Sequence, residues 1–191
     1  LRKLLSETMF YEGTFTAIKD YVQPVIDSLA VSLPIIIAMQ EKSRTAIIIG
    51  IAYFIIYIAS AYASRNSHKV AEKFKGENNG TKFLWKITTI SYFVLIPLFY
   101  FEIYIPAVII FIILNVLQNY WRPMQISRFD NFASEEEGAT VLSIESQAKS
   151  FATMIIAPVL GFLIDFTKSH NFGGEFWTIG FIGFLISLYF Y

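Results

Sequence analysis

Apolar positions along this chain come in long blocks rather than at the period of a helix or strand that buries one face. Each block is close to the ~20 residues that a helix needs to cross the hydrocarbon of a bilayer. Six blocks cover residues 20–40, 45–63, 83–104, 106–129, 139–166 and 176–191. The pattern predicts an all-α membrane protein with six transmembrane helices.

The residues before Asp20 mix apolar and charged positions, which predicts an amphipathic segment along the membrane surface. Pro97 falls inside the third block, where it predicts a kink. The chain begins at Leu1, and its last apolar block runs into Tyr191, so we expect a fragment of a longer protein.

The charged residues between the blocks predict the orientation. All but three of the 15 Lys and Arg residues fall on one side of the predicted membrane. The exceptions are Lys42, Arg44 and Lys168. Because cytoplasmic loops carry the excess of Lys and Arg, we expect a cell (inner) membrane protein with both ends of this chain facing the cytoplasm.

Composition supports the membrane class and excludes several functions. The chain is 55% hydrophobic and only 16% charged, against about 25% charged for soluble domains. A net charge of zero argues against a nucleic-acid partner. There is no Cys, and His68 and His170 lack metal-ligand spacing. We therefore expect no metal, no cofactor and no enzymatic activity.

The fourth block carries the most informative polar pattern. Asn115, Gln118, Asn119 and Arg122 recur at the spacing of one helix face. Because such groups are costly in lipid, this face must meet protein or a watery cavity. It is either the wall of a substrate pathway, with Arg122 near the cytoplasmic end, or an interhelical hydrogen-bond seam. Arg122 could instead reach the lipid headgroups.

The first block carries a weaker polar face, formed by Asp20, Gln23 and Asp27. Asp20 is expected at the membrane interface. Asp27 lies about two turns deeper, where an ionised carboxylate is expensive. It is a candidate for proton coupling or for binding a cationic substrate. Alternatively, it pairs with a basic side chain such as Arg122 or meets water near the mouth.

The fifth block has a polar ridge near its cytoplasmic end. Glu145 and Lys149 lie four residues apart, in the order that favours an ion pair on one helix. We expect these two residues to satisfy each other. The rest of the ridge is Thr140, Ser143, Gln147 and Ser150.

Four segments of the chain read KDYVQP at 19–24, SAYASRNSHK at 60–69, NYWRP at 119–123 and ATVLSIES at 139–146. Together they resemble the C-terminal half of bacterial major facilitator superfamily transporters. In that family a Gly-x-x-x-Asp-Arg-x-Gly-Arg/Lys-Arg/Lys loop follows the second span of each half. Ser60, Ser64, Arg65 and Lys69 fall on positions of this cytoplasmic signature loop, but only Arg65 and Lys69 keep its pattern.

The resemblance implies one half of a twelve-helix transporter, with two inverted three-helix repeats in each half and the substrate bound between the halves. It also implies that the first and fourth spans line the central cavity. We therefore expect a secondary active transporter of a small solute, working by alternating access and coupled to a proton gradient, as symporter or antiporter. Its partners would be membrane lipid, the missing N-terminal six-helix half and a small-molecule substrate of unknown identity. The alternative is a non-transporting six-span assembly or scaffold protein that acts as a dimer.

Overall fold

A computed structural model describes residues 1–32, 41–131 and 138–189, whose regular secondary structure is α-helical. The helices are α1 (Arg2–Lys19), α2 (Val22–Ser32), α3 (Glu41–Arg65), α4 (Ser67–Lys73), α5 (Glu77–Tyr100), α6 (Tyr104–Asp130), α7 (Gly138–His170) and α8 (Trp177–Tyr189). Four segments are long and apolar enough to cross a membrane: Ser43–Arg65, Glu77–Tyr100, Tyr104–Asp130 and Gly138–His170. The all-α fold is confirmed, and these helices fit a multi-pass membrane protein.

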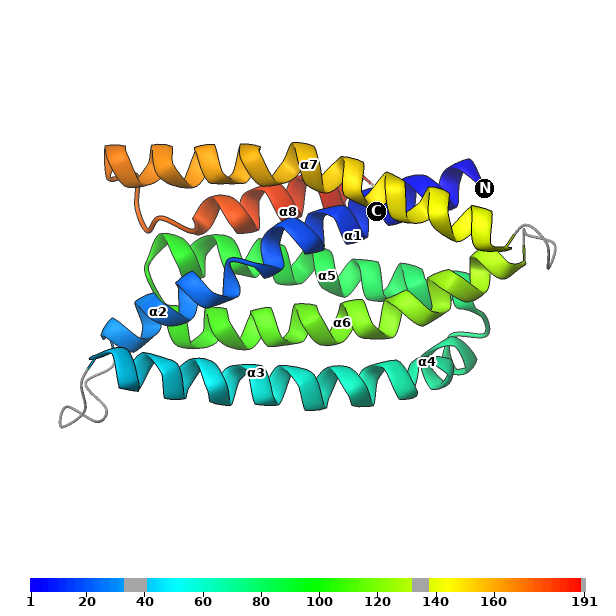
Figure 1. The fold of residues 1–191 in the computed structure, drawn as a ribbon, viewed down its shortest axis with the longest axis horizontal. Coiled ribbons are helices and arrows are strands. Elements are labelled where there is room, and N and C mark those ends of the chain that lie inside the picture. Colours follow the sequence, from blue (N-terminus) through cyan, green and yellow to red (C-terminus); the bar gives the residue numbers. More distant parts are fainter. Residues whose placement is uncertain (33–40, 132–137, 190–191) are drawn as a thin grey trace.

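The long helices lie side by side along one common direction, and each runs opposite to the next (Figure 1). α5 packs on both α8 and α6, α3 packs on α6, and α7 packs along α1. The short α4 lies at one end of the bundle, where α5 and α7 begin and α6 finishes. We call this the α4 end and the other the opposite end.

The outward faces of α3 and α7 are apolar. Phe54 on α3 and Phe162 on α7 are 66% and 68% exposed. Soluble monomers rarely carry large contiguous apolar patches, whereas lipid tails are as apolar as these side chains. The exposed rings therefore support the membrane interpretation independently of helix length.

The first predicted span is not one helix that starts near Asp20. α1 is helical before that position, and α2 follows after a break at Asp20 and Tyr21. The Tyr21 amide donates to the Ile18 carbonyl at 3.0 Å, and Pro24 has no amide hydrogen to donate. In Figure 1 this break lies between the two ends of the bundle. Residues 33–40 of the predicted span lie outside the described residues.

The prediction that the first residues lie along the membrane surface is wrong. α1 packs against α7 and buries Thr8, Tyr11 and Glu12. Gly13 allows this approach, since a Cβ there would lie 2.5 Å from the Ala152 Cβ. The close contact brings polar side chains of α1 into the bundle, which a surface helix would have turned toward water.

The other predicted spans overlap α3, α5, α6, α7 and α8, with shifted ends. α5 begins at Glu77, six residues before the predicted span, and these additional residues lie at the α4 end of the bundle. It ends before Glu102, which takes a left-handed φ of 58°. Pro97 lies inside α5, one turn before its end. Gly174 packs so tightly on the Phe99 carbonyl that a Cβ would collide with it, which fixes the turn into α8.

Two apolar clusters fill the interior. The larger one extends from the end of α1 toward the opposite end and includes Ile26, Phe99, Phe111 and Leu160. The smaller one lies nearer the α4 end and consists of Tyr11, Leu84, Trp85, Leu117, Trp121 and Met124. Glu12 and Arg122 directly follow Tyr11 and Trp121 of this smaller cluster along α1 and α6.

Candidate functional site

The candidate site is a cluster of four charged side chains contributed by α1, α6 and α7. Its members are Glu12, Arg122, Glu145 and Lys149, and we call it the charge cluster. Glu12 and Glu145 are only 3% and 1% exposed. Burial of charge is expensive unless the groups are paired, so the pairing geometry decides what this site can do.

Arg122 joins the three helices. Its Nη2 donates to Glu145 Oε2 at 3.0 Å, while its Nη1 pairs with Glu145 Oε1. The same Nη1 lies 3.2 Å from Glu12 Oε2. Two parallel bonds between a guanidinium and a carboxylate are the strongest form of this contact, so Glu145 holds Arg122 more firmly than Glu12 does.

Glu12 has two further partners. Lys149 Nζ lies 3.7 Å from Glu12 Oε2, and Gln118 Nε2 donates to Glu12 Oε1 at 3.3 Å. Both contacts are longer than the bonds between Arg122 and Glu145. The two acids and two bases of the cluster balance in charge. Because the contacts of Glu12 are longer than those of Glu145, Glu12 is the acid that exchanges partners more easily.

The expected pair between Glu145 and Lys149 on one helix is wrong. Glu145 turns to Arg122 of α6, and Lys149 turns to Glu12 of α1. The reason is burial: an interhelical partner is available to both groups inside the bundle, where a charge pair is stronger than on a solvated helix face.

A second polar network lies nearer the α4 end. Arg128 Nη1 pairs with Glu7 Oε2 at 2.6 Å and donates to Gln125 Oε1 at 2.6 Å. The buried Gln125 amide in turn donates to the Leu4 carbonyl at 3.2 Å and to Thr8 Oγ1 at 3.1 Å. This network ties α1 to the end of α6 and fixes the position of Glu12 along the bundle.

The polar face predicted on the fourth block divides in two. Gln118 and Arg122 belong to the charge cluster. Asn115 Nδ2 instead donates to the Phe111 carbonyl and Asn119 Nδ2 to the Asn115 carbonyl, both at 2.9 Å within α6. These two half-buried amides satisfy themselves on their own helix, and their role in a substrate pathway stays a prediction.

The polar residues predicted on the first block lie on α2, beyond the break. Gln23 is exposed and Asp27 is half-buried. Among the ion pairs of the described residues, none joins Asp27 to Arg122. The structure therefore keeps these residues apart from the charge cluster, and proton coupling at Asp27 stays a prediction.

The predicted signature loop lies at the α4 end, at the junction of α3 and α4. Ser64, Arg65 and Lys69 are exposed, and Ser60 is partly buried. These positions are open to solvent or to a partner, which leaves their predicted role untested.

Sequence reasoning missed Glu12. The residue was assigned to a surface segment, so its charge needed no partner. A signal was present: Arg122 and Glu145 both fall within predicted spans, and one arginine can hold two carboxylates. The small Gly13 beside Glu12 indicates close helix packing rather than a solvated surface.

The chemistry open to this site is proton and ion exchange. Within the described ranges, no group of three or more His, Cys, Asp or Glu side chains could hold a metal ion. No family model matches the chain, and no match is found among curated proteins or solved structures. The interpretation of the site therefore depends on its geometry.

Proposed function

We propose that this protein is a secondary active transporter of a small solute, that it works by alternating access coupled to a proton gradient, and that the charge cluster is its coupling site. One observation carries the proposal: four charged groups from three helices meet inside a bundle of long, largely apolar helices. Well-packed apolar residues would stabilise such a bundle equally well or better. Intramembrane charges commonly mark ion or proton pathways.

The cluster can convert a change in charge into a change in helix packing. A proton on Glu12 would remove its attraction to Arg122 and Lys149, which reach it from α6 and α7. An arriving charged solute would compete for the same partners. Protonation or solute binding would stabilise one helix arrangement relative to the other. The populations of the two arrangements would therefore shift.

The break between α1 and α2 supports a substrate pathway on that side of the bundle. Lys19, Asp20 and Gln23 are exposed there although the break lies between the two ends of the bundle. Exposed charges at that depth are not compatible with contact to lipid tails. We assign this face to a water-filled path that also passes Asp27.

The proposal includes a second six-helix half and inverted three-helix repeats, with the substrate bound between the halves. α1 and α2 together would form the first crossing, and α3, α5, α6, α7 and α8 the other five. The basic residues at the α4 end, including Lys69, Lys73 and Lys82, support a cytoplasmic position for that end.

The test is solute-driven proton movement in liposomes. The full-length protein is reconstituted with a pH-sensitive dye in the lumen and exposed to sugars, amino acids, organic anions and organic cations. We expect one class to drive proton movement, and Glu12→Gln to reduce it at least tenfold. The matched control is Glu72→Gln, which changes an exposed glutamate on α4 and should leave the flux unchanged.

The competing function, a non-transporting assembly protein, predicts the reverse pattern. Flux would be absent or unchanged by Glu12→Gln, while Arg122→Ala would abolish recovery of the assembled complex. That combination would exclude the transport proposal. Lost flux in a variant with normal folding and assembly would support it.

A further inference from the structure

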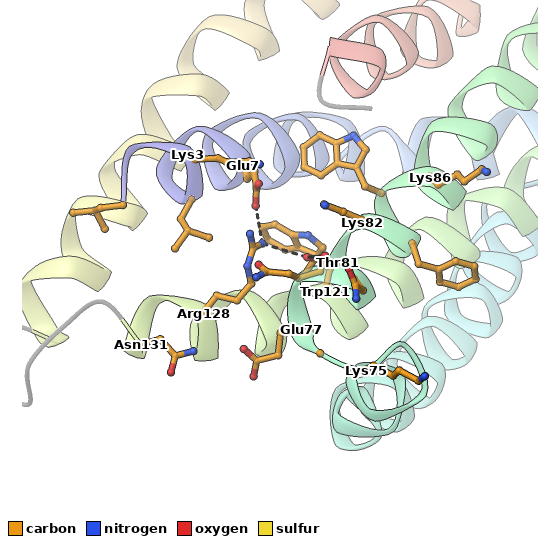
Figure 2. A pocket seen from close by; sticks show the side chains of 17 residues that line it. Lys3, Glu7, Lys75, Glu77, Thr81, Lys82, Lys86, Trp121, Arg128 and Asn131 are labelled. Atoms are coloured by element: carbon orange, nitrogen blue, oxygen red, sulfur yellow. Dashed lines mark hydrogen bonds and ion pairs between the residues drawn. The ribbon is translucent and has the colours of Figure 1, made fainter.

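A cavity of about 1170 Å³ lies at the α4 end, between α1, the start of α5 and the end of α6 (Figure 2). Its described lining includes no member of the charge cluster. The described lining carries five cationic side chains against two acidic ones; the cations are Lys3, Lys75, Lys82, Lys86 and Arg128. The cavity is therefore a concave, positively charged surface that the transport proposal does not use.

The two acids do not cancel this charge. Glu7 is already paired with Arg128 at 2.6 Å, which leaves Glu77 as the other acid of the described lining. Lys82 extends from α5 toward the middle of the cavity in Figure 2. An excess of positive charge with an ammonium group directed into the hollow favours an anionic ligand.

The cavity wall offers hydrogen-bond donors. Trp85 Nε1 already donates to the Ser187 carbonyl at 2.8 Å, and Trp121 Nε1 and Arg128 Nε are enclosed by protein. The accessible donors of the wall include the ammonium groups of the exposed Lys3 and Lys82. The first residues of α5, Asn78 and Asn79, also line the cavity, and the first amides of a helix lack intrahelical acceptors. A ligand rich in acceptor oxygens fits this wall.

The position of the cavity further limits the chemical class of ligand that it would bind. It lies where the apolar helices α5 and α6 reach their polar ends, and the aromatic rings of Phe83 and Trp85 line it. Aromatic rings beside Lys and Arg are typical of the depth at which lipid headgroups lie. Basic pockets between membrane helices bind anionic headgroups.

We propose that this cavity binds a phosphate-bearing anion, whose charge is held by Lys82 with Lys3 and whose apolar part lies against Trp85 and Phe83. The phosphate can come from the headgroup of an anionic phospholipid or from a soluble phosphate ester. The site is independent of the charge cluster, so its failure would leave the proposed transport untouched.

The test compares lipid binding to the purified full-length protein by native mass spectrometry in detergent. Phosphatidylglycerol should bind at least tenfold more tightly than zwitterionic phosphatidylcholine. Lys82→Gln should weaken phosphatidylglycerol binding about tenfold, the effect of one charged hydrogen bond. Lys73→Gln is the matched control, because Lys73 is exposed on α4 at the same end but is not among the lining residues.

A competition arm separates the two sources of phosphate. Displacement of the lipid by millimolar glycerol 3-phosphate would assign the site to soluble phosphate esters, and no displacement would assign it to the lipid. Equal binding of the two lipids, or equal effects of Lys82→Gln and Lys73→Gln, would overturn the proposal. Thermal unfolding of each variant verifies folding, and Lys3→Gln is the second variant if Lys82→Gln unfolds.

Discussion

Toward the opposite end of the bundle, the helices meet through apolar side chains such as Ile26 of α2, Phe111 of α6 and Leu160 of α7, each at most 1% exposed. Closer to the α4 end, α1 meets the same α6 and α7 through Glu12, Arg122 and Glu145. The stability of apolar packing does not depend on pH, whereas the stability of paired acidic and basic side chains does. One region therefore fixes the fold, and the other makes helix packing responsive to charge.

Arg122→Leu should produce the largest loss of stability, since it breaks the charged region and leaves two buried carboxylates with Lys149 as their remaining cation in the cluster. The free energy of unfolding should fall by about 3–5 kcal/mol, measured by denaturant titration in detergent. The control Arg65→Leu removes an exposed arginine at the end of α3. Equal stability of the two variants would show that the cluster is not paired as described.

Gly13→Ala should cost about 1–3 kcal/mol of stability through overpacking, because the new Cβ would lie 2.5 Å from that of Ala152. The matched change is Gly50→Ala on α3, where nothing lies within 4 Å of the added atom. That variant should be neutral or more stable, since Ala is the better helix former. Thermal unfolding compares the two, and an equal response would contradict the close contact between α1 and α7.

Replacing the cluster by apolar residues should affect stability less than breaking it. We expect the combined variant Glu12→Leu, Arg122→Met, Glu145→Leu and Lys149→Met to lie within about 1 kcal/mol of the parent protein, since buried ion pairs seldom exceed apolar packing in stability. Proton-coupled flux should nevertheless be lost. If the combined variant is as unstable as Arg122→Leu alone, the charges are structural.

Asn119→Ala should have the smallest effect on unfolding, about 0.5 kcal/mol or less. Its side chain donates to the Asn115 carbonyl at 2.9 Å, so the hydrogen bond that the substitution removes lies within one helix. Denaturant titration measures the change. A loss above about 2 kcal/mol would show that Asn119 supports the bundle as Arg122 does.

The long apolar helices were predictable because their blocks match the thickness of a bilayer. α6, for example, covers the expected residues 106–129 with two additional residues before Pro106 and one after Phe129. The place of α1 inside the bundle was not predictable, because α1 carries charged residues that a hydropathy window counts against it. Those residues find partners only after folding, which the local sequence does not show.

Part of the candidate site, the polar face of α6, was also predictable from the sequence. The helix face with Gln118 and Arg122 was expected to meet protein or water because lipid could not solvate it, and its contacts with Glu12 fit that expectation. The partner of Glu145 was not predictable from spacing. Lys149 lies closer along the chain, but the choice between it and Arg122 depends on how α6 and α7 pack.

The break at Asp20 and Tyr21 separates α1 and α2 into two straight segments. The Val25 amide bonds to the Tyr21 carbonyl at 3.1 Å, so α2 keeps its own hydrogen bonds up to the break. α1 has 18 residues and is about 27 Å long at the helical rise per residue. Glu12 lies seven residues before the end of α1, about 10 Å from the break, so a tilt of about 5° there would move it by about 1 Å. Its distances to Arg122 and Lys149 would then change without unwinding either helix.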